Sequence, residues 1–357
     1  MRLDAWTVLD TGQPMALQRR DETPGPDEAL VAVAGCGICH TDLGFYYNGV
    51  PTRHPLPLTL GHEVSGTVIE AGQRAQSWLG KPVVVPAVIP CGDCDTCLAG
   101  RGQICPNQIF PGNDIHGGFA THLRVPVRGL CAVPQLDDPV RNPKGLQLAA
   151  LAVIADAIST PYQAIERSGL ARGDLAVFVG TGGVGGFGVQ LAAAREAVVA
   201  AVDIDADRLK LISNHGATLT LNANELDFKS IRSAVRDLAK AHDIPSWRQR
   251  IFETSGTEGG QTTAFGLLGH GAYLSVIGFT QKKVEIRLSN LMAYDATAEG
   301  NWGCLPEHYP AIVELVLSGK VSLEPFIEFR PMSWINETFA EIHEGKLSRR
   351  VILTPET

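Results

Sequence analysis

Four cysteines lie close together in the segment CGDCDTCLAGRGQIC, with the spacing C-x2-C-x2-C-x7-C: Cys91, Cys94, Cys97 and Cys105. Four thiolates complete the tetrahedral shell of a structural Zn²⁺ ion, at about 2.3 Å from each sulfur. A disulfide cluster is disfavoured in a chain of 357 residues for which we expect no secretion signal. An iron–sulfur site is harder to exclude from spacing alone. The pattern therefore predicts a closed zinc site that stabilises the fold and takes no part in catalysis.

A second group of potential metal ligands precedes this loop. Cys39 lies in GCGICHTD, and His62 and Glu63 lie in LGHEVSG. A catalytic zinc keeps fewer protein ligands than a structural one and leaves a position for water or substrate. We expect Cys39 and His62 each to close a strand-like run, EALVAVAGCGIC and PLPLTLGHE, so that a sheet holds them. Taken singly, either residue is more often buried structure. Their joint occurrence ahead of the four-cysteine loop favours a catalytic zinc site.

A glycine-rich turn lies in the middle of the chain. The segment LAVFVGTGGVGGFGVQLAAA predicts a buried strand, a turn and a helix, and Gly180, Gly182 and Gly185 match G-x-G-x-x-G. Such glycines permit a tight turn and a close approach of the backbone to a pyrophosphate at the helix N-terminus. A bare motif also fits an ordinary strand–helix corner. With its strand and helix in place, the turn predicts dinucleotide binding, with Gly183 and Val184 as further contacts.

The next strand-like run, EAVVAAVDID, ends at Asp203. An acidic residue at this place accepts hydrogen bonds from the adenosine ribose and repels a 2′-phosphate, so we expect NAD rather than NADP. Arg208 is a nearby cation that can accept a phosphate, and we count it among the cofactor residues. Ile277, in the later run YLSVIGF, is a further candidate for cofactor contact.

The motifs GHEVSG, CGDCDTC and GTGGVG occur in the order found in zinc-dependent medium-chain alcohol dehydrogenases. The sequence resembles this family over essentially its whole length. The resemblance implies an α/β protein with a GroES-like β-rich catalytic domain and a Rossmann domain built on a doubly wound parallel sheet. It places the catalytic domain and both zinc sites in residues 1–160, the NAD-binding domain in 161–302, and a return to the catalytic domain in 303–357.

The resemblance also implies a third ligand of the catalytic zinc. In the family this ligand lies just before the cofactor domain and is a cysteine or an acidic residue, and here Asp156 takes that place. A helix-capping role is the alternative for Asp156. Glu63 is then either a group behind the ligands or a ligand that exchanges with water. Asp42 is expected to orient His62, as carboxylates behind zinc-bound histidines do.

The residues expected to handle the proton follow Cys39. Thr41 resembles the family's hydroxyl that accepts the alcohol proton, and His40 resembles its basic residue beside the pyrophosphate. In many relatives a histidine three residues after the hydroxyl passes the proton to solvent. Gly44 stands at that position here, so the usual relay is broken, and His40, His54 or water are the candidates to replace it.

The composition is that of a globular enzyme, with 45% hydrophobic residues and a mean hydropathy near zero. The net charge of −8 does not indicate the excess of basic residues that is typical of nucleic-acid-binding proteins. No membrane segment is expected, because the longest apolar stretch is explained by the nucleotide turn. We expect a reducing compartment, by default the cytoplasm, and a homo-oligomer, either a dimer or a tetramer. Cys36, Cys131 and Cys304 are expected to be small buried residues.

Two late segments narrow the substrate. GNWGCLPEHYP and RLSNLM resemble a subgroup of the family that oxidises a ring alcohol of an acyl-CoA thioester in anaerobic aromatic degradation. Cations are available for the CoA phosphates: Arg53, Lys282, Lys283, Arg349 and Arg350. Tyr46, Tyr47 and Trp302 are candidates either for the wall of a ring pocket or for core packing. The alternatives are a dehydrogenase of a simple alcohol or polyol and, more remotely, a non-enzymatic dinucleotide-binding protein.

Overall fold

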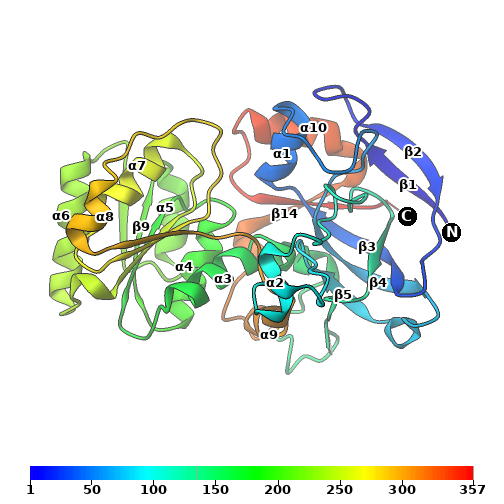
Figure 1. The fold of residues 1–357 in the computed structure, drawn as a ribbon, viewed down its shortest axis with the longest axis horizontal. Helices are drawn as coiled ribbons and strands as arrows, with labels where there is room; N and C mark the ends of the chain where they lie inside the picture. Colours follow the sequence, from blue (N-terminus) through cyan, green and yellow to red (C-terminus); the bar gives the residue numbers. More distant parts are fainter. Residues whose placement is uncertain (135, 357) are drawn as a thin grey trace. The chain divides into compact units, whose positions relative to one another are not determined.

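The computed structural model describes residues 1–134 and 136–356, which form two compact units (Figure 1). The first unit comprises Met1–Ser159, Gly303–Gly319 and the chain from Phe326 onward. The second comprises Thr160–Trp302 and the short stretch Lys320–Pro325. The first unit is therefore assembled from three separate stretches of sequence.

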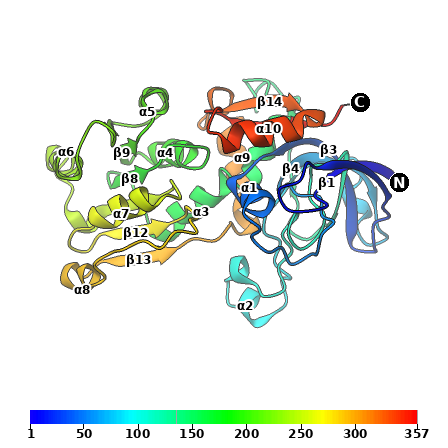
Figure 2. The same cartoon turned by 90° about the horizontal axis from the view of Figure 1, so that it is seen from above.

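The second unit is built on a six-stranded parallel sheet in the order β10-β9-β8-β11-β12-β13 (Figure 2). Its strands are β8 (Leu175–Val179), β9 (Val198–Asp203), β10 (Leu219–Asn222), β11 (Gln249–Glu253), β12 (Tyr273–Val276) and β13 (Thr297–Gly300). Numbered from its own first strand, the order is 3-2-1-4-5-6, that of the Rossmann fold. The order reverses between β8 and β11, and dinucleotides bind beyond the carboxyl ends of the strands at this point. The expected α/β fold is thus confirmed.

Helices connect these strands. They are α4 (Gly185–Ala194), α5 (Ala206–Ser213), α6 (Phe228–Ala241), α7 (Glu258–Gly266) and α8 (Ser289–Tyr294), whereas α3 (Ser159–Ser168) precedes β8. Helix α6 illustrates why they form: Asp227 caps it by accepting a hydrogen bond from the Ser230 N–H at 2.8 Å. Ile231, Val235 and Ala239 recur every four residues and bury one face of the helix against the sheet.

The first unit contains a seven-stranded, mostly antiparallel sheet in the order β14-β15-β3-β4-β5-β7, with β6 paired to β3. Its strands are β3 (Glu28–Gly37), β4 (Glu63–Ala71), β5 (Pro82–Val85), β6 (His122–Pro126), β7 (Cys131–Ala132), β14 (Ile327–Pro331) and β15 (Arg350–Thr354). Strands β1 (Arg2–Thr7) and β2 (Ala16–Asp21) form a separate antiparallel pair. The last of these strands in the sequence, β15, thus lies between β14 and β3.

The helices of the first unit are α1 (His40–Tyr47), α2 (Asp95–Leu98), α9 (Tyr309–Leu317), α10 (Ile335–His343) and the 3₁₀ helix η3 (Leu148–Ala155). Single 3₁₀ turns are η1 (Gln76–Trp78), η2 (Gly102–Ile104), η4 (Ser246–Arg248), η5 (Pro306–His308), η6 (Glu324–Phe326) and η7 (Met332–Trp334). Among the described residues, no single helix has the length and apolar content needed to cross a membrane; η3 and α3 meet these limits only when joined across a 44° bend.

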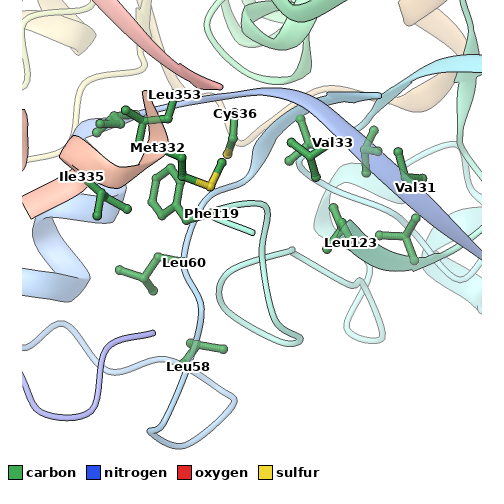
Figure 3. Close-up of a cluster of buried hydrophobic side chains, with 14 of the residues drawn as sticks. Val31, Val33, Cys36, Leu58, Leu60, Phe119, Leu123, Met332, Ile335 and Leu353 are labelled. Atoms are coloured by element: carbon green, nitrogen blue, oxygen red, sulfur yellow. The ribbon is translucent and has the colours of Figure 1, made fainter. Parts of the chain in front are cut away.

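The core of the first unit gathers side chains from distant parts of the chain. Figure 3 shows Cys36, Phe119, Met332 and Ile335 lying together in this core. Tyr46 belongs to the same cluster and meets Phe339 edge-to-face at 5.3 Å. Of the two expectations for Tyr46, core packing is therefore the one that the structure supports. The other two cysteines expected to be small buried residues, Cys131 and Cys304, are also buried.

Candidate functional site

The four-cysteine loop brings its sulfurs to one point. The Sγ–Sγ distances are 3.8 Å for Cys91–Cys97, 3.6 Å for Cys94–Cys97, 3.7 Å for Cys94–Cys105 and 3.4 Å for Cys91–Cys105. A disulfide bond is about 2.05 Å long, so none is formed here. A tetrahedron with metal–sulfur bonds of about 2.3 Å has edges of about 3.8 Å. In an iron–sulfur cluster the four thiolates are divided between two or more irons, so they cannot all lie around one point. The geometry fits a single zinc ion.

The backbone of this loop also suits thiolates. The Gly92 N–H points to Cys97 Sγ at 3.4 Å, and the Cys91 N–H points to Cys105 Sγ at 3.5 Å. Gly92 has a φ of +89°, a conformation that residues with a Cβ rarely adopt. The glycine thus lets the chain reverse so that N–H groups face the sulfurs and stabilise their negative charge.

The second predicted group of ligands also converges. One donor atom each from Cys39, His62, Glu63 and Asp156 lies within 4.8 Å of the others. Asp156 Oδ2 is 3.5 Å from Cys39 Sγ and 3.6 Å from His62 Nε2. Cys39, His62 and Glu63 are buried, whereas the Asp156 side chain is 18% exposed. A thiolate, an imidazole and a carboxylate around one point are a donor set that zinc accepts with a position left open.

The local chain explains how Cys39 and His62 are held. Cys39 follows β3 and caps the N-terminus of α1, and its N–H donates to Asp42 Oδ2 at 2.9 Å. Asp42 Oδ1 accepts from His62 Nδ1 at 3.2 Å, which leaves His62 Nε2 facing Asp156. The expectation that His62 closes a strand is wrong, since it precedes β4 in an irregular segment. Pro55 and Pro57 lack the N–H groups that a strand ladder needs.

Glu63 is held on both oxygens. Its Oε1 accepts from the Ala157 N–H at 3.0 Å, and its Oε2 accepts from Arg350 Nε at 2.9 Å. A second guanidinium N–H of Arg350 donates to Oε1. Of the two roles expected for Glu63, these contacts favour a group behind the ligands over a ligand.

Arg350 corrects one of our expectations. Its side chain is only 4% exposed and is paired with Glu63, so it is not available to a CoA phosphate. Its neighbour Arg349 remains exposed. Sequence reasoning missed the ion pair because the two residues are 287 positions apart and only Glu63 belongs to a short motif.

The expected proton-handling residues lie at the start of α1. Thr41 Oγ1 is 3.7 Å from Cys39 Sγ, so the hydroxyl borders the catalytic ligand group. The preceding residue, His40, is exposed. At Gly44, an added Cβ would meet only Val50 Cγ2, at 3.6 Å, so a side chain would fit there but the sequence supplies none. His54 Nδ1 contacts the Pro55 carbonyl at 2.6 Å.

The glycine-rich turn has the geometry of a dinucleotide cradle. Gly180 has a φ of +96°, and a Cβ there would lie 2.6 Å from Ser255 Cα. A Cβ on Gly185 would lie 1.9 Å from the Gly180 carbonyl oxygen. At Gly182, by contrast, the space is open except for Arg208 Nη1 at 3.7 Å. Gly183 and Val184 are half-exposed, and Val184 is the N-cap of α4. The turn is thus closely packed at Gly180 and Gly185 and open at Gly182, which leaves room for a pyrophosphate to approach the backbone.

Asp203 lies at the end of β9, as expected, but its carboxylate is turned inward and is 7% exposed. Oδ2 accepts from the Thr181 N–H at 2.5 Å and from the Thr181 hydroxyl at 2.9 Å. Oδ1 accepts from the N–H groups of Ile204 and Asp205 at 2.7 and 3.0 Å. Since a carboxylate offers about four acceptor sites, a ribose hydroxyl must share or replace one of these bonds.

Arg208 and Ile277 also lie near this turn. The buried Nε of Arg208 has no hydrogen-bond partner among the described residues, and its nearest acid is Asp205 Oδ2 at 3.5 Å. Ile277 follows β12 directly, and its N–H donates to the Glu253 carbonyl at 2.9 Å. Arg208 therefore lies beside the glycine-rich turn, and Ile277 lies at the carboxyl end of the sheet next to the last residue of β11.

Comparisons with known proteins match two parts of the chain to families of dehydrogenases. Residues 25–135 match the family model described as Alcohol dehydrogenase GroES-like domain, and residues 183–318 match Zinc-binding dehydrogenase. An alcohol dehydrogenase of Geobacillus stearothermophilus is 29% identical over 329 residues, covering 91% of each chain. Galactitol 1-phosphate 5-dehydrogenase of Escherichia coli K12 is 27% identical over 344 residues, covering 92% of this chain and 93% of its own. A solved alcohol dehydrogenase of Thermotoga maritima has a TM-score of 0.86 and 26% identity, with 100% of both chains covered.

The chain therefore belongs to the zinc-dependent medium-chain alcohol dehydrogenase family. It is an oxidoreductase that acts on the CH–OH group of an alcohol or polyol, with zinc and a nicotinamide dinucleotide as cofactors. The GroES-like and Rossmann domains predicted from the sequence are confirmed. The remote alternative of a non-enzymatic dinucleotide-binding protein finds no support.

Proposed function

We propose that this dehydrogenase oxidises the ring alcohol of 6-hydroxycyclohex-1-ene-1-carbonyl-CoA to the 6-oxo thioester, in anaerobic benzoyl-CoA degradation. The observation that carries the proposal is the likeness of GNWGCLPEHYP and RLSNLM to the dehydrogenase of that substrate. Trp302, in the first of these segments, is 49% exposed and so is available to contact an apolar ring.

In the proposed reaction the alcohol loses a hydride from carbon and a proton from oxygen. When bound, zinc supplies a Lewis acid for the alcohol oxygen, and the nicotinamide accepts the hydride. Cys39, His62 and Asp156 hold the metal. Asp42 fixes the orientation of the His62 ring. Thr41 Oγ1, beside Cys39, takes the proton and passes it to solvent, because Gly44 offers no relay histidine.

The proposed cofactor is NAD in preference to NADP. The four hydrogen bonds to Asp203 hold an anion beside the glycine-rich turn. This charge disfavours a 2′-phosphate even though the carboxylate has few free acceptor sites. Arg208 acts in the opposite direction, since its guanidinium lies near Gly182.

The cations left for the CoA phosphates are Arg53, Lys282, Lys283 and Arg349. Arg53 is 55% exposed although it pairs with Asp114 at 3.3 Å, and the other three are exposed. Remote binding energy of this kind can hold the reacting carbon against the nicotinamide, so a truncated substrate loses kcat as well as affinity.

A simple alcohol or polyol is the second candidate substrate. Relatives named as alcohol dehydrogenase and galactitol 1-phosphate 5-dehydrogenase favour it. The deciding experiment compares kcat/KM with NAD for the CoA thioester, its free acid, cyclohexanol and galactitol 1-phosphate. A clear preference for the thioester supports the CoA substrate. If cyclohexanol or galactitol 1-phosphate matches it, the simple-alcohol or polyol function takes its place.

Homo-oligomerisation is also part of the proposal. Phe279, Leu288 and Met292, in one segment of the second unit, are 70%, 67% and 79% exposed. Strand β13, which follows this segment in the sequence, is an edge strand of the six-stranded sheet. Among the described residues no strand pairs with its outer edge, so this edge can pair with a strand of another copy. Light scattering after gel filtration should give a dimer or tetramer that Leu288→Glu with Met292→Glu shifts toward the monomer.

A further inference from the structure

Glu253 is a fully buried carboxyl group that neither zinc site uses. It is the last residue of β11, the strand beside β8 at the point where the sheet order reverses. Its exposed fraction is 0%. Placing a carboxyl group out of water is costly unless its hydrogen bonds are made, so a buried glutamate at this place needs an explanation.

One oxygen of Glu253 organises the turn that follows the strand. Oε1 accepts from the Ser255 N–H at 2.8 Å, the Ser255 hydroxyl at 2.6 Å and the Gly256 N–H at 3.1 Å. These three donors come from two consecutive residues, so a single acceptor fixes the path of the chain there. Gly256 has a φ of +62°, which keeps the turn tight.

The other oxygen lies against the neighbouring strand end. Oε2 is buried and makes no hydrogen bond of good geometry within the described chain, although the Gln261 side chain lies close enough to Glu253 to act on its pKa. A Cβ on Gly278 would lie 2.6 Å from it. Burial raises the pKa of Glu253, which favours the neutral form of a carboxyl group enclosed in this way. Glu253 thus fills the space between the turns that end β11 and β12.

The turn that Glu253 holds is the support of the cofactor cradle. A Cβ on Gly180 would lie 2.6 Å from both the N and the Cα of Ser255. The Thr254 hydroxyl donates to the Gly180 carbonyl at 2.7 Å. Because the Ser255 backbone leaves no room for a side chain at Gly180 and the Thr254 hydroxyl holds the Gly180 carbonyl, a shift of this turn should displace Gly180 or open a gap beside it.

We propose that Glu253 is a positioning residue for the dinucleotide: its buried carboxyl group fixes the Thr254–Gly256 turn against which the glycine-rich turn is set. It acts through Ser255 and Gly180 and touches no substrate. This inference rests on the assignment of the Gly180–Gly185 turn as the cofactor site.

The test uses the zinc-loaded, full-length enzyme and measures the Kd for NAD by calorimetry, together with kcat and KM. Glu253→Met keeps the side-chain volume and removes the acceptor, and should raise the Kd and KM for NAD at least tenfold without lowering kcat more than twofold. Glu253→Gln keeps an acceptor for Ser255 and resembles the neutral carboxyl group, and should stay within threefold of the unmodified enzyme.

Gln249→Met is the matched control. Gln249 is buried at the opposite end of the same strand, 8% exposed, so its replacement perturbs β11 without touching the turn. If Glu253→Met leaves the Kd for NAD within twofold, or Gln249→Met raises it equally, the role is structural only and the proposal is overturned. If Glu253→Met fails to fold, Glu253→Asp replaces it, because the shorter aspartate side chain withdraws the acceptor from Ser255. Glu253→Asp is then compared with Glu253→Gln, and the same fold-changes in the Kd for NAD support or overturn the proposal.

A second variant separates this inference from the cofactor-site assignment. Gly182→Val obstructs the open side of the turn and should abolish NAD binding. If Gly182→Val binds NAD normally, the assigned cofactor site is wrong. If Gly182→Val loses NAD while Glu253→Met keeps it, only the role of Glu253 is refuted.

Discussion

Replacing Arg350 by methionine should strongly destabilise the first unit. Arg350 and Glu63 are buried to 4% and 0% exposure and make paired hydrogen bonds. Methionine leaves Glu63 as an uncompensated buried carboxylate, a change that costs about 3–5 kcal/mol in other proteins. We expect the lower end, about 3 kcal/mol, because the Ala157 N–H still donates to Glu63. For a unit of this size that corresponds to a Tm lower by roughly 6–12 °C.

Thermal and urea unfolding of the zinc-loaded protein would measure this loss, with zinc content checked in each sample. Arg349→Met is the control, because the adjacent arginine is exposed and should change the stability by no more than about 0.5 kcal/mol. The double variant Arg350→Met with Glu63→Met removes both charges and should regain most of the loss. A loss below about 1 kcal/mol for Arg350→Met, or a double variant as unstable as the single one, would refute the reasoning.

Other predictions address the metals, the cofactor and pH. Elemental analysis should give about two zinc ions per chain. The variant Cys94→Ser should lose one zinc ion and much of the stability of the fold, whereas Cys39→Ser should keep the fold and lose turnover. Asp203→Ala should raise KM for NAD and narrow the preference over NADP; equal kcat/KM for both cofactors before mutation would contradict the role of Asp203. Burial lowers the pKa of His116 to about 4 from 6.5. The unfolded chain therefore binds the proton more readily, and stability should fall between pH 6.5 and 4, by on the order of 1–2 kcal/mol at pH 5. His116→Asn should reduce this fall in urea titrations, and an equal fall in both proteins would rule out His116 as its source.

Local motifs account for what could be predicted. The cysteine loop and the glycine-rich turn are each contained in one short segment, so spacing alone specifies which atoms meet. The helix α6 was not predicted from the sequence, although its signals are present: Asp227 as a cap and Ile231, Val235 and Ala239 at one face.

The contacts that sequence reasoning missed join distant segments. Glu63 and Arg350 meet only because β15 returns to lie beside β3. The inward turn of Asp203 depends on Thr181, which reaches it through the pairing of β8 with β9. The role of Glu253 could not be predicted from the sequence, because many strands end with a charged residue that lies at the surface. Tertiary burial, and not local propensity, determines the role of these three acids.

The late arrival of β15 has a consequence for synthesis on the ribosome. Glu63 emerges long before Arg350, which follows 287 residues later. At a synthesis rate of about 5–20 residues per second, Glu63 lacks its Arg350 partner for roughly 15–60 s. During that interval the nascent first unit lacks β15, the strand between β14 and β3, while the second unit has been synthesised up to Trp302. Premature termination just before Arg350 would remove this arginine and the whole of β15, and we expect cellular quality control to degrade the resulting chain.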